Sequence, residues 1–241
     1  MRSLAFLALL ATTVAAPASA DRIGPNRLDS GTPIGTAWSS TAQFSALTAV
    51  GPDDIRFTTG QRWQLRAEGD PETLARLRFV VEDNQLIIGR RSGEKAKLRP
   101  ATVYVVAPAL RRATVGGSGS LEIDRLTGKK VSASLAGSGG LSVADIDADA
   151  LDASLAGSGA MSLKGRSTAA NLAIAGSGEL RGAGLTVGSA STAIAGSGSM
   201  AFRSNGRVSA SIIGSGNVSV RGSADCSRVT RTGSGTLRCG A

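Results

Sequence analysis

Histidine is absent from the 241-residue chain, and aromatic residues are scarce: two tryptophans, one tyrosine and five phenylalanines. Without histidine, Ser-His-Asp and Cys-His nucleophilic systems and histidine metal sites cannot form. So few rings cannot build the stacking platforms on which proteins bind single-stranded nucleic acids. We therefore expect no catalytic residues, no metal or other cofactor, and no nucleic-acid partner.

Cysteine is limited to Cys226 and Cys239, both near the C-terminus. In an exported protein, an even number of cysteines predicts a disulfide. Closing so short a loop contributes ~3 kcal/mol in the chain-entropy model. The alternative is a metal pair, which lacks further ligands because the chain has no histidine.

Long apolar runs are confined to the N-terminus, where residues 1–20 have the pattern of a secretory signal peptide. Arg2 supplies the positive charge, an apolar run extends from Leu4 to Val14, and Ala18-Ser19-Ala20 matches a small-residue cleavage site. The run is too short to cross a bilayer core of ~30 Å. We expect an exported protein (periplasmic, outer-surface or extracellular) that does not span the membrane.

Acidic residues are outnumbered by basic ones, 18 to 27, which gives a formal net charge of +9. A basic protein outside the cytoplasm meets anionic lipid head groups, lipopolysaccharide and acidic polysaccharides, and its charge attracts them. The predicted partner is an anionic glycan or envelope surface. The alternative is a solvated basic surface without a partner.

What the chain does contain is a repeat. The tripeptide Gly-Ser-Gly occurs seven times at steps of 18 to 20 residues, beginning at Gly117, Gly137, Gly157, Gly176, Gly196, Gly214 and Gly233. A fixed period near 20 residues is typical of a solenoid, in which each repeat is a coil that cannot bury its own apolar face. We expect glycine at these turns because it reaches positive φ without steric penalty. The middle serines then form a ladder along one corner; the alternative is a ligand-binding row of hydroxyls.

Apolar residues recur at three positions of each repeat: two residues before the first glycine, and four and six residues after it. The residue between the last two is mostly polar or small. This period of two predicts a strand with an inward apolar face and an outward polar face. The predicted fold is all-β: a single-stranded parallel β-helix with about 19–20 residues per coil and a β-rich N-terminal cap.

The segments before the repeats differ in composition. Residues 21–37 are rich in glycine, proline and polar residues and predict a flexible lead-in. Residues 38–112 carry short β-prone runs and predict a β-rich cap, or first irregular coils, continuous with the solenoid. A hairpin turn is expected at Glu82–Gln85 and a short helix after Asp70. Residues 113–241 form the repeat β-helix.

The last repeat departs from the pattern. Arg231 stands where six aliphatic residues precede it, and Cys239 falls on an inward position, with Cys226 expected in the coil before. A terminal coil needs a polar end or a staple because nothing stacks on it. We expect the disulfide to tie down this open end.

One acidic cluster interrupts the basic composition. Asp145, Asp147 and Asp149 alternate, so on a strand they would share one face. Polysaccharide lyases and hydrolases built on β-helices use clustered carboxylates with cations or as acid/base pairs. The equivalent positions of the next coil carry no carboxylate, being taken as Arg166, Thr168 and Ala170. We expect a solvated acidic edge; a cation or catalytic site is the alternative.

The leader, the segment Thr102–Leu110 (TVYVVAPAL) and the Leu-Ala-Gly-Ser-Gly coils at Leu135 and Leu155 together resemble one family. It is a secreted bacterial domain of unknown function, the auto-transporter adhesin head or GIN domain, and the resemblance covers about residues 38–240. The resemblance implies a right-handed parallel β-helix and no established catalytic residues. The adhesin name is an analogy and adds little to function.

These features favour a secreted, non-enzymatic β-helix protein that binds or scaffolds components of the cell envelope in the manner of an adhesin. The alternative is a β-helix carbohydrate-active enzyme that acts on acidic polysaccharide through the Asp145, Asp147 and Asp149 edge.

Overall fold

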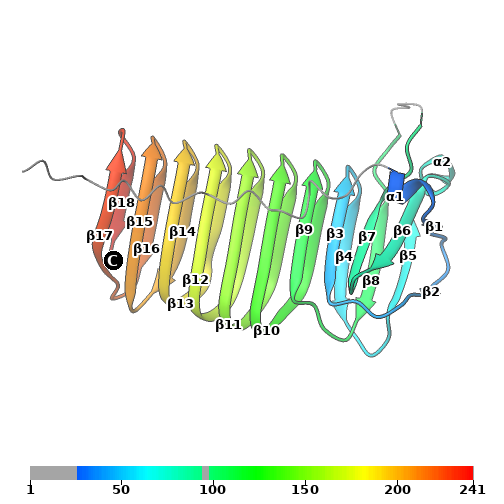
Figure 1. Ribbon diagram of the computed structural model, residues 1–241, viewed down its shortest axis with the longest axis horizontal. Coiled ribbons are helices and arrows are strands. Elements are labelled where there is room, and N and C mark those ends of the chain that lie inside the picture. Colours follow the sequence, from blue (N-terminus) through cyan, green and yellow to red (C-terminus); the bar gives the residue numbers. More distant parts are fainter. Residues whose placement is uncertain (1–25, 94–97, 241) are drawn as a thin grey trace, which may run out of the picture.

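The computed structural model describes residues 26–93 and 98–240, and most of them lie in β-strands stacked as the coils of a solenoid (Figure 1). The predicted signal peptide and the first part of the lead-in lie outside these residues. The described strands join in one 18-stranded sheet. The two helices, α1 (Asn26–Asp29) and α2 (Pro71–Leu74), have four residues each. Neither is long and apolar enough to cross a bilayer.

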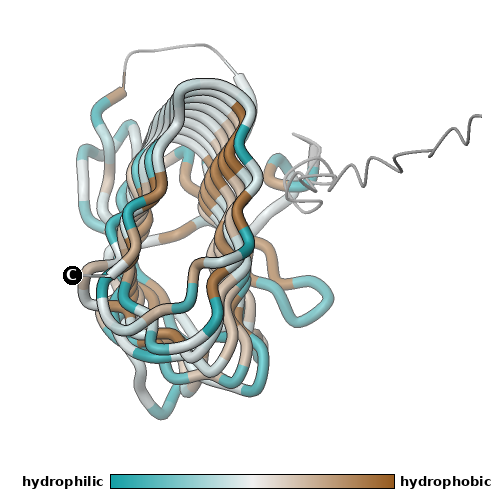
Figure 2. The backbone as a smooth tube through the Cα atoms, turned by 90° about the vertical axis from the view of Figure 1, so that its left-hand side faces the viewer, coloured by the Kyte–Doolittle hydropathy of each residue, from teal (hydrophilic) through white to brown (hydrophobic). Residues whose placement is uncertain are grey.

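Each coil consists of two walls of parallel strands, joined on one side by a Gly-Ser-Gly corner and on the other by a middle segment. In β10 (Ser120–Gly137), wall A is residues 120–123, the middle segment is 124–130, and wall B is 131–137. The next strands follow the same path: β11 (Gly140–Gly157), β12 (Ala160–Gly176) and β13 (Glu179–Gly196). Figure 2 views the stack from its C-terminal end, with the coils lying one behind another.

In the last coils the two walls are separate strands. Wall A continues with β14 (Ser199–Ser204), β16 (Asn217–Arg221) and β18 (Thr236–Cys239). Wall B continues with β15 (Arg207–Gly214) and β17 (Asp225–Thr232). All neighbouring strands of both walls are parallel. The expected parallel β-helix is therefore confirmed, and its right-handed sense stays a prediction.

The inward positions form columns of buried apolar side chains, as the alternation predicts. In wall A, Leu121, Leu141, Met161 and their equivalents up to Val218 lie in register and are at most 2% exposed. In wall B the same holds from Leu135 to Ile212. Full burial of one such side chain contributes roughly 1.5–3 kcal/mol. The core is thus a continuous stack that no single coil could form.

The corners owe their shape to both glycines of the tripeptide. The first glycine of every copy has φ between +110° and +125°, a conformation that side chains with a Cβ rarely adopt. Its carbonyl oxygen accepts hydrogen bonds from the next coil. For example, the N–H groups of Ser158 and Gly159 both donate to the Gly137 oxygen, at 3.1 and 3.0 Å. A Cβ on Gly159 would lie 2.5 Å from the Gly139 oxygen. The serines are exposed, so the ladder is the expected turn.

The first coil precedes the first Gly-Ser-Gly. Strand β3 (Ala46–Gly51), a corner at Gly51-Pro52-Asp53, and β4 (Asp54–Thr59) form it. Gly51 lies in register with Gly117, and Ile55 with Leu121. The expectation that the segment before the repeats is continuous with the solenoid is therefore confirmed.

After β4 the chain leaves the stack to build the cap, and β9 (Arg112–Gly117) returns on the other side of β3. In the cap, β7 (Gln85–Arg90) and β8 (Thr102–Ala107) extend the walls in parallel, while β5 (Gln64–Glu68) and β6 (Leu77–Glu82) pair antiparallel. Two short strands, β1 (Thr32–Pro33) and β2 (Ser39–Ser40), flank it. The expected hairpin turn is at Asp83-Asn84, both with positive φ, and the expected helix is α2.

A buried ion pair joins the cap to the first coil. Asp53 stands in the corner column where later coils have the second glycine of Gly-Ser-Gly, and its side chain is 3% exposed. The Arg90 guanidinium donates to both carboxylate oxygens, at 2.7 and 2.6 Å, and the N–H of Ala101 donates at 2.8 Å. Removing one partner of such a pair leaves a buried charge uncompensated, at a cost of ~3–5 kcal/mol. This pair fixes the cap on the stack.

The first prediction compares two residues of one coil. Cutting buried Leu155 to alanine should cost ~2–5 kcal/mol of unfolding free energy, the range for buried leucine truncations. Cutting exposed Ser158 to alanine should cost ~1 kcal/mol or less, because it removes at most one hydroxyl hydrogen bond. Paired urea melts measure both. Equal losses would mean that the serine ladder is buried structure or a site.

The second prediction concerns the second glycine of the Gly-Ser-Gly corner. Gly159→Ala should destabilise by ~3 kcal/mol or more, at the upper end for overpacking, because the new Cβ meets the backbone of the coil before it. Gly140→Ala is the matched control. Its Cβ would contact only the Ser120 Cβ, at 3.7 Å, and the next coil already has Ala160 in that register. Thermal unfolding of both variants measures the difference, and a mild effect at Gly159 would contradict the close approach.

Candidate functional site

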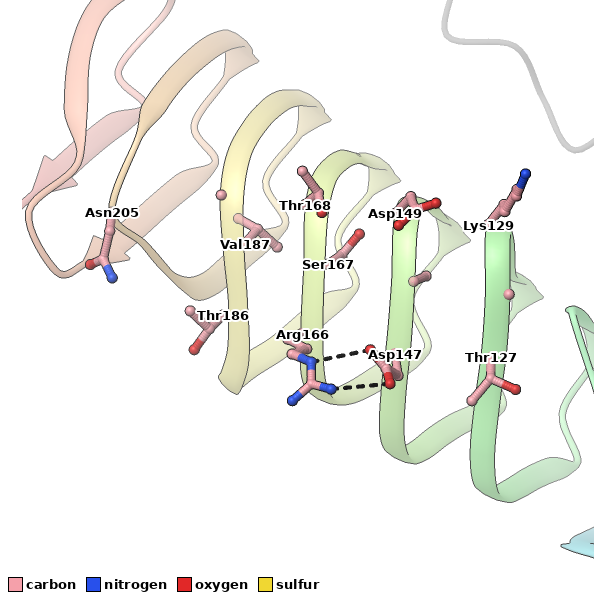
Figure 3. A pocket seen from close by; sticks show the side chains of 13 residues that line it. Thr127, Lys129, Asp147, Asp149, Arg166, Ser167, Thr168, Thr186, Val187 and Asn205 are labelled. Atoms are coloured by element: carbon pink, nitrogen blue, oxygen red, sulfur yellow. Dashed lines mark hydrogen bonds and ion pairs between the residues drawn. The ribbon is translucent and has the colours of Figure 1, made fainter.

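An open groove runs along the middle segments of successive coils (Figure 3). Its volume is about 680 Å³, and Lys129, Asp147, Asp149, Thr168 and Asn205 are among its lining residues. With Thr186 of β13, the lining residues come from five consecutive coils. The groove therefore offers polar groups at the repeat distance of parallel strands, ~4.8 Å.

One row of side chains crosses the coils, in the middle segments of β10 to β13 and at the end of wall A in β14 and β16. The members lie in strand register, from one coil to the next: Thr127, Asp147, Arg166, Thr186, Arg203 and Arg221. We call this the junction row. Its acidic member is near one end, and its last two members are both arginines.

The predicted acidic edge lies on this surface. Asp145, Asp147 and Asp149 all point outward, while Ile146 between the first two is buried. The Arg166 guanidinium donates to both oxygens of Asp147, at 3.1 and 3.2 Å (Figure 3). Asp145 pairs with Arg125 at 3.0 Å. Asp149 forms no hydrogen bond or ion pair with another described residue.

The alignment of Arg166 with Asp145 was wrong by one alternation. The structure places Arg166 beside Asp147, because β12 has 17 residues against 18 in β11 and the register shifts between Val143 and Ile146. The sequence repeat alone does not show where within a coil the missing residue falls. The shift places Arg166 in register with Asp147, and the two form an ion pair.

These contacts limit the chemistry of the edge. A general acid or base pair needs two carboxyl groups held near one bond, with one of them kept protonated by burial or by its neighbour. Asp147 is exposed and Asp145 is half-buried, and each is paired with a guanidinium. Within residues 26–93 and 98–240, no three acidic or cysteine side chains are grouped so that they could hold a metal ion. The groove is suited to binding polar groups.

Asp152 lies on wall B, outside the groove, between Lys130 and Asn171. The Lys130 ammonium lies 2.8 Å from one carboxylate oxygen and the Asn171 amide donates to the other at 2.8 Å. Burial alone would raise the pKa of Asp152, but the hydrogen bonds from Lys130 and Asn171 and the charge of Lys130 outweigh it. The pKa is therefore below its ordinary value.

Cys226 and Cys239 form the predicted disulfide, with Cα atoms 6.4 Å apart. Cys226 lies at the start of β17 in wall B and Cys239 at the end of β18 in wall A, with the corner at Gly233 between the two strands. The bond links the start of wall B strand β17 to the end of wall A strand β18. It therefore closes the end of the stack on the side where the earlier coils have a middle segment. Arg231, at the position where the last repeat departs from the pattern, is exposed.

Several basic residues of the earlier coils have carboxylate partners, but those of the last coils do not. Arg56, Arg125, Lys130, Arg166 and Arg181 each form an ion pair. Residues 199–240 contain one acidic residue, Asp225, and six arginines, a net charge of +5 out of +9. The six are Arg203, Arg207, Arg221, Arg228, Arg231 and Arg238. All are exposed, and none is ion-paired within the described residues.

Comparison with known proteins places these features in a family. The family model described as "Putative auto-transporter adhesin, head GIN domain" matches residues 43–224. No curated protein matches the chain.

Several solved structures have the same fold. A "putative adhesin" from Bacteroides fragilis NCTC 9343 has a TM-score of 0.78 at 18% identity, over 85% of this chain and 95% of its own. A "putative lipid binding protein" from Parabacteroides distasonis ATCC 8503 has a TM-score of 0.68 at 23% identity, over 88% and 98%. A "putative adhesin" from Parabacteroides merdae ATCC 43184 has the same TM-score and coverage at 20% identity. At these identities the likeness shows the fold alone.

The third prediction concerns the pH dependence of the Asp152 contacts. Because the pKa of Asp152 is lower in the folded chain, its contribution is complete above the unfolded value of ~3.9 and is lost as the pH falls through the folded value. Asp152→Asn should therefore cost ~1 kcal/mol or less near pH ~6, and this cost should disappear near pH ~2. Urea melts at both pH values measure it. A cost that persists at the lower pH would contradict the view that the ionised Asp152 carboxylate provides the stabilisation.

Asp149→Asn is the matched control, since it removes one exposed carboxylate of the same coil without removing a contact. It should leave the unfolding free energy at neutral pH within ~0.5 kcal/mol of the wild-type value.

Proposed function

The chain belongs to the auto-transporter adhesin head GIN domain family, and from this premise we propose that it is an exported, non-enzymatic β-solenoid that binds anionic components of the cell envelope. The observation that carries the proposal is the block of unpaired, exposed arginines on the last coils. Such charge attracts anionic partners over roughly a Debye length, ~8 Å at physiological ionic strength.

The fold supports binding rather than turnover. Columns of in-register backbone and side chains hold the outward residues of successive coils at a fixed spacing of ~4.8 Å, which suits an extended or repetitive partner. The acidic edge, which was the basis of the enzymatic alternative, has two of its three carboxylates engaged by arginines. We therefore assign the carboxylates a role in aligning coils.

Location outside the cytoplasm is part of the proposal. The family, the adhesin descriptions of similar structures and the disulfide between Cys226 and Cys239 support export. The relative described as lipid-binding fits the same chemistry, because lipid head groups and acidic glycans both present anions. Periplasm, outer surface and extracellular medium are all compatible with the proposal.

The fourth prediction tests this function directly. The purified chain should bind lipopolysaccharide and acidic glycans on an array and ignore neutral glycans of the same length. Binding should weaken as the salt concentration rises from about 0.02 M to about 0.5 M, because the Debye length shrinks. Absence of binding to every anionic probe at the low salt concentration would contradict the proposal.

Turnover assays on the bound acidic polysaccharides, with and without calcium, complete the test. We expect no product. A product whose formation is abolished in the Asp147→Ala/Asp149→Ala double variant would restore the enzymatic alternative.

A further inference from the structure

A second depression lies on the outer face of wall A, across strands β13, β14, β16 and β18. Its volume is about 690 Å³. Small and polar outward residues of β14 and β16 line its centre; we call these four residues the wall A floor: Ser199, Ala201, Asn217 and Ser219. Because they are in register on adjacent parallel strands, they occupy the corners of a rectangle of about 5 Å by 7 Å. Large side chains are absent from this rectangle.

Arginines frame the wall A floor on three sides. Arg181, Ala201, Ser219 and Arg238 lie in one register line across four strands, so Arg181 and Arg238 stand on opposite sides. Both also line the depression. On the side of the middle segments, Arg203 and Arg221 of the junction row follow two residues after Ala201 and Ser219. Strand alternation therefore directs them to the same outer face, ~7 Å from the floor.

The charge of this frame is almost uncompensated. Glu179 is the one acidic residue that lines the depression, and its carboxylate is engaged by Arg181 at 2.6 Å. Arg203 and Arg221 are directly in register on neighbouring strands, an arrangement in which like charges destabilise each other. In the earlier coils the one arginine of the junction row, Arg166, has an acidic neighbour, Asp147, which neutralises its charge. At Arg203 and Arg221, a bound anion would have the same effect.

We propose that the wall A floor and its four arginines bind a segment of a linear anionic polysaccharide; this deepens the proposed function and rests on it. Guanidinium groups match carboxylate, sulfate and phosphate groups with two parallel hydrogen bonds. Hydroxyl and amide groups of the floor, with Thr236 beside Asn217, supply donors and acceptors for sugar hydroxyls. The absence of large side chains lets a chain of rings lie flat across β14 and β16.

The surface favours a polysaccharide over a lipid bilayer. A protein that rests on a bilayer usually adds apolar side chains that enter the interface beside its cations. Among the described residues, the large apolar side chains that are exposed are Trp38 and Ile213. Neither lines the depression, and Ile213 is in β15 of wall B. The concave, polar floor fits a glycan chain.

The fifth prediction uses the full chain and polygalacturonate oligomers as the probe, with neutral dextran and vesicles of phosphatidylcholine and phosphatidylglycerol as comparisons. Arg203→Gln/Arg221→Gln should raise the dissociation constant for polygalacturonate by at least about tenfold, because two charge-assisted contacts are lost. Arg228→Gln/Arg231→Gln is the matched control: it removes the same charge from wall B strand β17 and should change the constant by less than about twofold.

A third variant occupies the floor without removing an arginine. Ala201→Glu places a carboxylate in the register line between Arg181 and Ser219 and should weaken binding at least as much as the double variant. Ala201, Arg203, Arg221 and Arg228 lie at outward positions, and Arg231, in register with inward Ile212, is exposed on the last coil. Thermal unfolding of each variant confirms the fold.

The outcomes separate this inference from the proposed function. Selective loss in the wall A variants supports the site. Equal loss in the wall A and wall B variants, or no loss in either, overturns the site while leaving envelope binding in place. Vesicle binding without polygalacturonate binding overturns the glycan assignment in favour of a lipid surface. A wild-type chain that binds no anionic probe overturns both.

Discussion

The close approach of backbone to backbone at the corners is the constraint on which the rest of the molecule depends. The first glycine of each corner turns the chain at positive φ, and its carbonyl oxygen accepts hydrogen bonds from the coil that follows. The second glycine leaves no room for a Cβ. Because every corner sits directly on the one before it, the register of both walls is set at a single point per coil. The apolar columns of the core, the serine ladder and the junction row are consequences of that register.

This constraint also explains what could be predicted. The Gly-Ser-Gly period and the alternation around it were enough for the parallel strands, the inward columns and the exposed serines, because corner and strand impose strict residue requirements. The coil at Gly51-Pro52-Asp53 lacks the tripeptide, since Asp53 faces the cap and its buried partner Arg90 rather than another corner. That long-range pairing, and the excursion of the chain between β4 and β9, leave no periodic trace in the sequence.

The candidate site was less predictable than the fold. The sequence identified Asp145, Asp147, Asp149 and the two cysteines, but the partners of the carboxylates depend on where a shorter coil loses its residue, which is a matter of local bulging. The excess of positive charge was visible, while its arrangement was not. Register is needed to see that Arg203 and Arg221 are neighbours and that Arg181 and Arg238 stand on opposite sides of small residues. Composition gives the sign of the surface charge, and the stacking of the coils determines how the charges are arranged.

The interchangeability of the coils makes the length of the molecule a quantity that recombination can change. Each middle coil pairs with the coil on either side, and its corner is the same as theirs. Duplication or loss of one unit in the gene would lengthen or shorten the stack by ~4.8 Å without exposing the core. The ends cannot be exchanged in this way, because Asp53–Arg90 and the disulfide each close one end. The length of the stack can therefore differ among descendants of such a gene. The cap, the disulfide-closed end and the basic coils next to that end would stay the same.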